Sequence, residues 1–101
     1  MSAVAVEHAR QQWEEGHRRL QSHSSDHALY NRLHTQVDAV VNELNRRLGQ
    51  TFTLAELAVA YREADRWLPE VVGPGAGASD LALIQDAAFH VYARGAVDYV
   101  P

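Results

Sequence analysis

One stretch of the chain decides which fold is possible, and it reads SDLALIQDAAFHVYARG from Ser79 to Gly95. Ser79 and Asp80 are typical of a helix start, and Gly95 is typical of a helix end. The residues between them are apolar almost all round, apart from a narrow polar side of Gln85, Asp86, His90 and Arg94. Such a helix either lies at the centre of a fold or is covered by a partner. The pattern predicts this fourth helix and leaves both explanations open.

A Gly/Pro-rich stretch separates this segment from an earlier helix. Residues 73–78 read GPGAGA, which predicts a flexible linker. Upstream of it, Thr53 and Glu56 form the T-x-x-E capping box that marks a helix start. We expect the third helix to begin after Thr53 and to end at Leu68, because Pro69 restricts the backbone of the residue before it.

Two longer helices are expected in the N-terminal half. Apolar residues recur every three or four positions over 6–20 and again over 30–48, as they do in amphipathic helices. Ser24 or Ser25 can cap the second of these helices. Gly16 lies on the apolar face, or seam, of the first of these helices. Glycine lowers helix stability there by about 1 kcal/mol, and a close approach of another helix would offset this loss. We predict an all-α fold of four helices: an N-terminal antiparallel helical hairpin with two further helices packed against it.

The composition limits the possible chemistry. The chain has 101 residues and a formal net charge of −4, and its size predicts a single helical domain over 1–101. It has no Cys, which excludes disulfides, thiolate zinc sites and cysteine nucleophiles. All nine positive residues are Arg, so chemistry that needs a lysine Schiff base is excluded as well. No apolar run approaches the roughly 20 residues that span a bilayer, and we expect a cytoplasmic protein without a cofactor.

The histidines are the candidates for a ligand site. His27, His34 and Asp38 of the second helix would share one face and could bind zinc, although a solvated polar stripe explains the same spacing. A metal-binding or small-molecule-binding protein is therefore an alternative function. The six histidines could also sense pH, because imidazole titrates at about pH 6.5.

Nucleic acid is not an expected partner. Binding to phosphates needs clustered cations, and the chain has a net charge of −4. In the third helix Arg62 and Arg66 alternate with Glu63 and Asp65 instead of forming a basic stripe. A nucleic-acid-binding regulator therefore ranks as a further alternative.

The surplus of aromatic and large apolar side chains suggests a protein partner. Aromatic residues are enriched where interfaces are anchored, although the same residues would also complete a four-helix core. We expect a non-enzymatic protein–protein interaction module, a bacterial regulatory or adaptor protein that binds another protein or a second copy of itself. The candidate partner-binding residues are Trp13, Leu20, Trp67, Phe89, Tyr92 and Tyr99.

Two stretches resemble small, functionally uncharacterised helical proteins of high-GC actinobacteria. They are FTLAEL over 52–57 and DAAFHVYARGAVDY over 86–99. The resemblance implies a bacterial cytosolic setting. It brings no catalytic residues with it, because those proteins have no assigned activity.

Overall fold

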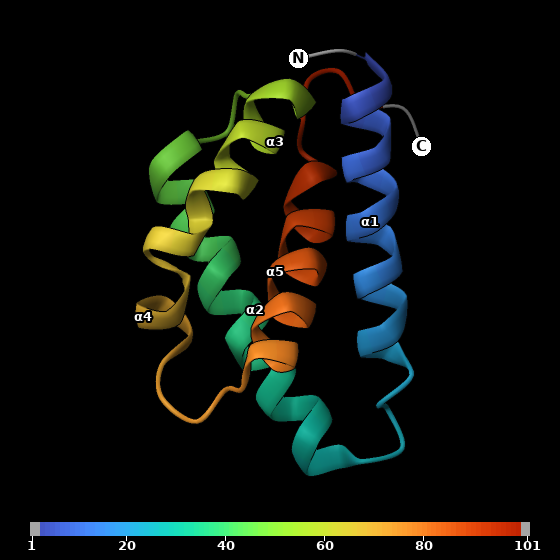
Figure 1. Ribbon diagram of the computed structural model, residues 1–101, viewed down its shortest axis with the longest axis vertical. Helices are drawn as coiled ribbons and strands as arrows, with labels where there is room; N and C mark the ends of the chain where they lie inside the picture. Colours follow the sequence, from blue (N-terminus) through green and yellow to red (C-terminus); the bar gives the residue numbers. More distant parts are fainter. Residues whose placement is uncertain (1–2, 100–101) are drawn as a thin grey trace.

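The computed structural model describes residues 3–99, and most of them are helical (Figure 1). The helices are α1 (Ala3–Gln21), α2 (His27–Leu48), α3 (Leu54–Glu63), α4 (Leu68–Val72) and α5 (Ala78–Ala93), with a 3₁₀ turn, η1 (Ala64–Arg66), between α3 and α4. The predicted all-α class is confirmed, although residues 3–99 form five helices instead of four. None of the helices in this range has the length and apolar character needed to cross a membrane.

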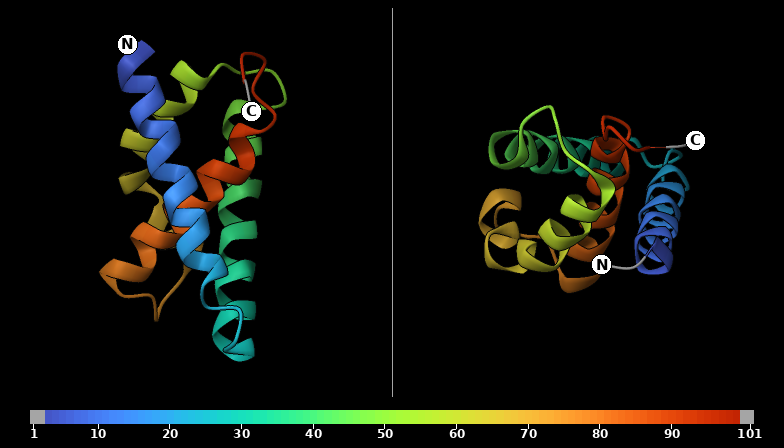
Figure 2. Two further views of the ribbon diagram at one scale, coloured as in Figure 1. Left: turned by 90° about the vertical axis from the view of Figure 1, so that its right-hand side faces the viewer. Right: turned by 90° about the horizontal axis from the view of Figure 1, so that it is seen from above.

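The apolar helix α5 lies at the centre of the fold. It packs most extensively against α1 on one side and against α2 on another, and α3 and α4 cover further parts of it. Figure 2 shows the other helices arranged around it. Ile84, Ala87, Ala88 and Phe89 are fully buried. Burial within the chain therefore accounts for the apolar character of this helix.

The predicted packing of α1 directly onto α2 is wrong. The two helices are antiparallel and joined by a short turn, but they make few contacts with one another because α5 lies between them (Figure 1). Both apolar seams face this helix instead: Trp13 and Leu20 of α1, and Val40 and Leu44 of α2, are all buried. An amphipathic seam shows that a face is buried but does not identify the helix that covers it.

Helices α1 and α5 approach each other closely at Gly16. A Cβ atom placed on Gly16 would lie 2.2 Å from Cβ of Asp86 and 3.4 Å from the backbone nitrogen of Ala87. Atoms cannot pack at the shorter of these distances, so any larger residue would push the two helices apart. The expected close approach of a helix at Gly16 is present, and the helix that approaches is α5.

The third predicted helix is broken near its end. Regular α-helix stops at Glu63, the chain tightens into η1, and Trp67 leaves helical geometry with φ −124°. Pro69 then lies in the first turn of α4, where the missing N–H of proline costs no hydrogen bond. Pro69 therefore helps to start a short helix as well as to limit the preceding one.

The helix caps agree in part with the sequence prediction. The capping box of Thr53 and Glu56 is confirmed. Helix α2 is capped by Asp26, whose side chain accepts a hydrogen bond from the Leu29 backbone, and not by Ser24 or Ser25. Helix α5 begins at Ala78, one residue before the predicted Ser79.

The C-terminal segment packs back onto the start of α3. The backbone N–H of Val97 donates to the carbonyl oxygen of Phe52 at 2.9 Å. The backbone N–H of Leu54 donates to Oδ1 of Asp98 at 2.8 Å, which satisfies one of the free donors at this helix N-terminus. The tail therefore packs back onto the fold as far as Tyr99, and the last two residues lie outside the described part.

The Gly16 contact leads to a stability prediction. Gly16→Ala should lower the free energy of unfolding by about 1–3 kcal/mol, because overpacking forces the helices apart. This loss should exceed the gain in helix propensity of about 1 kcal/mol. Urea unfolding followed by circular dichroism measures the difference.

Gly77→Ala is the matched control. A Cβ atom at Gly77 would meet nothing within 4 Å, and its φ of −77° suits any residue. Its free energy of unfolding should change by no more than about 0.5 kcal/mol. Equal effects of the two substitutions would contradict the close packing of α1 on α5.

Candidate functional site

Four of the six candidate partner-binding residues are buried in the core: Trp13, Leu20, Phe89 and Trp67. Trp13, Leu20 and Phe89 are fully or almost fully buried. The Trp13 ring lies 5.6 Å from the Phe89 ring and 5.9 Å from the Tyr61 ring, centroid to centroid. This aromatic cluster joins α1, α3 and α5, so these side chains stabilise the fold and are not accessible to a partner in this structure.

Tyr92 and Tyr99 are partly buried at the end of the molecule where the tail packs. The Tyr92 ring is stacked on Phe52 at 4.5 Å, and its hydroxyl donates to the carbonyl oxygen of Gly49. The Arg10 guanidinium lies 5.7 Å from the centroid of the Tyr99 ring. Both tyrosines therefore have partners within the chain: Tyr92 connects α5 to the α2–α3 loop, and Tyr99 connects the tail to α1.

Trp67 is different, because it borders a groove on the surface. The groove has a volume of about 470 Å³ and lies between the C-terminal part of α2 and the segment formed by α3, η1 and α4. Trp67 is 8% exposed. The apolar lining consists of Leu44, Leu48, Ala60 and Trp67, and the charged lining consists of Arg47, Glu63, Arg66 and Glu70.

Arg47 is held in place at the edge of this groove. Its guanidinium carbon lies 4.8 Å from the centroid of the Trp67 ring, within the range of a cation–π interaction. Its Nε atom also lies 2.8 Å from Oε2 of Glu43, one turn earlier in α2. Two contacts in different directions limit the rotamers of Arg47, so the groove presents an ordered guanidinium beside an indole ring.

The sequence did not reveal this groove, although it suggested Trp67. Residues 54–68 were expected to form one continuous helix, which would have no hollow beside Trp67. The break at η1 turns the chain and places Trp67 opposite α2. A single sequence contains no strong indication of a 3₁₀ turn at Ala64–Arg66, and the only local cue is Pro69 downstream.

A polar network connects α1, α3 and α5 on another side of the molecule. The Tyr61 hydroxyl donates to Oδ1 of Asp86 at 2.6 Å. The Gln12 amide nitrogen lies 2.9 Å from the Tyr61 hydroxyl oxygen and 3.5 Å from the same Asp86 oxygen. Gln85 donates to the backbone carbonyl oxygen of Tyr61 at 3.0 Å, which satisfies an acceptor near the end of α3.

The network shifts the pKa values of two of its members. Burial raises the pKa of the Asp86 carboxyl, and the hydrogen bonds from Tyr61 and Gln12 oppose that rise. Burial, together with the bond to Asp86, raises the pKa of the Tyr61 hydroxyl. Tyr61 thus stays protonated at neutral pH and acts as a donor, a role that positions Asp86 where α1 and α5 meet.

The candidate metal ligands do not form a site. His27 and Asp38 are exposed on α2, whereas His34 is partly buried with its ring edge-on to Tyr30 at 4.4 Å. Within residues 3–99, no group of three or more His, Cys, Asp or Glu side chains is arranged to hold a metal ion. The structure instead brings His17 of α1 against His90 of α5, a pair that sequence spacing could not indicate because the residues are far apart in the chain.

The hydrogen bond from Tyr61 leads to a prediction about stability and about Asp86. Tyr61→Phe should lower the free energy of unfolding by about 1.5–3 kcal/mol, the usual range for a hydrogen bond to a charged group. The pKa of Asp86 should rise further, because the lost bond favours the carboxylate. Urea unfolding and an NMR titration of the carboxyl carbon measure the two effects.

Tyr30→Phe is the matched control for this prediction. The Tyr30 hydroxyl donates to Oε1 of Gln21 at 2.6 Å in an exposed pair, so its loss should cost less than about 1 kcal/mol. An equal cost for both substitutions, or an unchanged pKa of Asp86 in Tyr61→Phe, would contradict the assigned network.

Comparisons with protein-family models, with curated proteins and with solved structures found no match to this chain. The resemblance of 52–57 and 86–99 to actinobacterial proteins therefore stays an expectation, as does the bacterial cytosolic setting.

Proposed function

We propose that the protein is a non-enzymatic interaction module that binds another protein through the groove beside Trp67. The observation that carries the proposal is the ordered Arg47 guanidinium over the Trp67 ring at the edge of an apolar hollow. Trp and Arg are the residue types most often found at the energetic centre of an interface. Because Arg47 is held by Glu43 as well, binding here costs little additional side-chain entropy.

The chemistry of the groove suggests what the partner presents. An apolar side chain of the partner fits against Leu44, Leu48 and Ala60. The rim carries charges of both signs, with Arg47 and Arg66 beside Glu63 and Glu70. A partner segment with one apolar anchor between acidic and basic residues is complementary to this rim.

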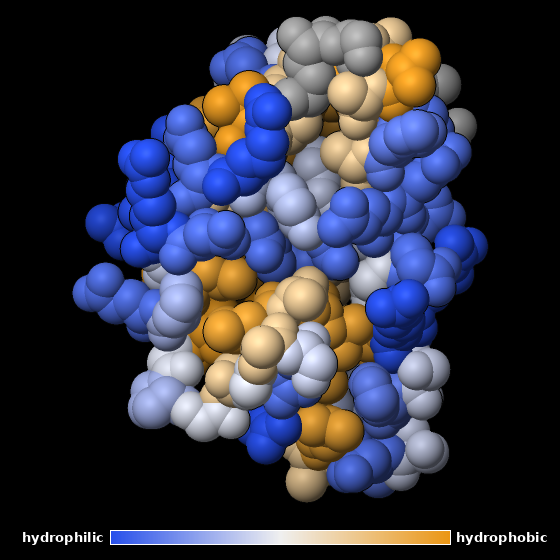
Figure 3. Space-filling model, viewed as in Figure 1, coloured by the Kyte–Doolittle hydropathy of each residue, from blue (hydrophilic) through white to orange (hydrophobic). Residues whose placement is uncertain are grey.

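A second hollow is less suited to such an anchor. In the view of Figure 3, apolar side chains gather over α4 and the N-terminal half of α5. There Leu68, Pro69, Leu81 and Ala82 contribute to a groove of about 350 Å³. Its lining contains neither an aromatic residue nor an arginine, which is why we place the interface at Trp67.

The two alternative functions gain no comparable observation. The candidate ligands His27, His34 and Asp38 are not brought together. Six of the nine arginines lie within ion-pair distance of an acidic side chain in residues 3–99 (Arg10, Arg18, Arg19, Arg32, Arg46 and Arg47). Arginines distributed in this way do not form the basic stripe that binding to nucleic acid requires.

A groove-filling substitution tests the proposal without removing a core side chain. Ala60→Trp should block the apolar hollow and weaken binding of a partner purified from the native host by at least about tenfold, or about 1.4 kcal/mol. Arg66→Glu should weaken it through the rim charge. Affinity capture identifies the partner, and isothermal titration calorimetry with that partner measures the dissociation constants.

The controls place the same changes elsewhere. Ala82→Trp fills the second groove, and Arg62→Glu reverses a charge on α3 that faces α1 and not Trp67. Both controls should bind like the wild-type protein. A partner that binds Ala60→Trp as tightly as Ala82→Trp would contradict the proposed site, and so would a monomer that captures no protein. Sedimentation equilibrium distinguishes a second copy of the chain from a different partner.

A further inference from the structure

Two imidazole rings face each other across the main helix–helix contact of the fold. His17 of α1 and His90 of α5 have ring centroids 4.7 Å apart and an interplanar angle of 32°. His90 is only 8% exposed. We propose that His17 and His90 form a proton-sensitive latch, which holds α1 against α5 at neutral pH and loosens this contact in mildly acidic solution.

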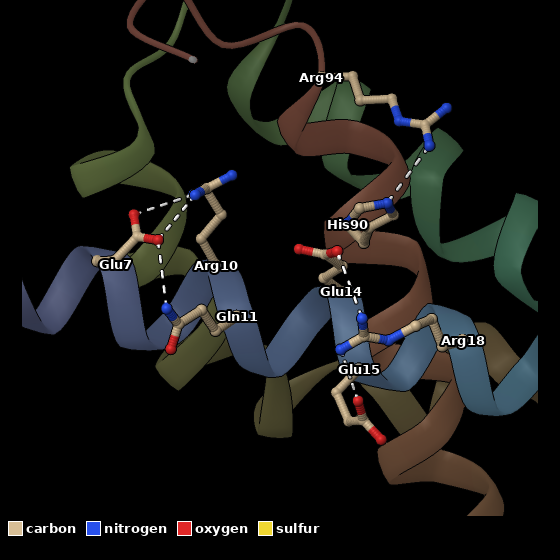
Figure 4. A network of polar contacts seen from close by, with 8 residues as sticks. All are labelled: Glu7, Arg10, Gln11, Glu14, Glu15, Arg18, His90 and Arg94. Atoms are coloured by element: carbon tan, nitrogen blue, oxygen red, sulfur yellow. Dashed lines mark hydrogen bonds and ion pairs between the residues drawn. The ribbon is translucent and has the colours of Figure 1, made fainter. Parts of the chain in front are cut away.

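The contact of His90 with Arg94 requires a neutral ring. Nη2 of Arg94 lies 3.4 Å from Nε2 of His90, as Figure 4 shows. Arginine can only donate, so Nε2 must accept and its proton must be absent. Protonation of His90 would turn this hydrogen bond into a contact between two cations.

The groups around the pair come from all three helices that meet here. His34 of α2 acts electrostatically on His17, and Arg94, which caps the C-terminus of α5, acts on both histidines. From α1, Arg10 and Glu14 act on His90, and Glu14 is the only one of these groups that favours the protonated ring. Glu14 also forms an ion pair with Arg18, whose Nη1 atom lies 3.7 Å from Oε1 of Glu14 (Figure 4). The surroundings therefore oppose the addition of charge.

His34 contributes a buried nitrogen atom, Nε2, without a hydrogen-bond partner among the described residues. The group of α2 that acts on His17 is therefore the imidazole of His34 and not a carboxylate. No carboxylate is among the described groups that act on His17, and Glu14 acts on His90.

The sign of the pH effect follows from the environment. Burial lowers the pKa of His17 and of His90, and the positive neighbours lower both further. The unfolded chain therefore binds more protons than the folded protein just below pH 6.5, the ordinary value for these groups. Stability is then fully present above that pH, and it is lost as the pH falls toward the lowered folded values.

Two carboxyl groups cannot account for a loss of stability in this range. The raised pKa of Asp86 means that the folded state binds the proton more readily, so its protonation favours folding. The pKa of Glu7 is lowered mainly by its hydrogen bond from Arg10. Its contribution is lost only below 4.5, the ordinary pKa of this group.

The test uses Trp13 as a reporter of the α1–α5 contact. Trp13 lies one turn before His17 on α1 and is fully buried. In a Trp67→Phe background Trp13 is the only tryptophan, and acrylamide quenching reports its exposure. Between pH 7.5 and 5.0 we expect quenching to increase, and the unfolding constant in urea to rise by up to about tenfold per pH unit for each histidine.

Adding His17→Gln and His90→Gln to this background should abolish most of both changes, because glutamine does not titrate. The matched control replaces two exposed histidines, His8→Gln and His27→Gln, and should keep the full pH dependence. The latch is disproved if the His17/His90 double variant retains the wild-type pH dependence, or if the control variant loses it.

An NMR titration of the imidazole Cε1–H signals in the unmodified chain decides the case even if the double variant fails to fold. His17 and His90 should titrate below pH 6.5, the ordinary value for an imidazole. Titration of both at about pH 6.5 would overturn the proposal.

Discussion

The burial of α5 is the constraint on which the rest of the structure depends. A helix that is apolar on almost every side has to be covered on every side, and no single neighbour can do so. The chain covers it with α1 and α2 on two sides and with α3 and α4 elsewhere. Helices α1 and α2 of the N-terminal hairpin are therefore separated by α5. Gly16 lets α1 come close to Ala87, which is fully buried.

The few polar residues of α5 are where this burial has functional consequences. Gln85 donates to the backbone at the end of α3, and Asp86 accepts from Tyr61. These two contacts lie next to the point where α3 tightens into η1, and that turn creates the groove beside Trp67. Of the other two polar residues, His90 faces His17 of α1, and Arg94 lies within hydrogen-bond distance of His90. The proposed binding surface and the proposed latch thus depend on the same helix.

Local features could be predicted well because they depend on neighbouring residues. The capping box at Thr53 and the close approach at Gly16 both follow from residue types at short spacing. The end of α3 could not be predicted in this way, because the 3₁₀ turn has no strong local pattern. The residue type alone marks Trp67 as a candidate. Arg47 has no such local signal, because its contact with Trp67 joins two helices that are distant in the sequence.

The sequence by itself determined the helical class, the positions of most helix ends, the burial of each apolar seam and the absence of cysteine and lysine chemistry. Only the tertiary structure decided which helix each seam faces, and therefore that Trp13, Leu20 and Phe89 are core residues while Trp67 borders a groove. The physical reason is that periodicity records which face of a helix avoids water but carries no information about what covers it. The pairs Arg47–Trp67 and His17–His90 join distant parts of the chain, so only the folded protein brings them together.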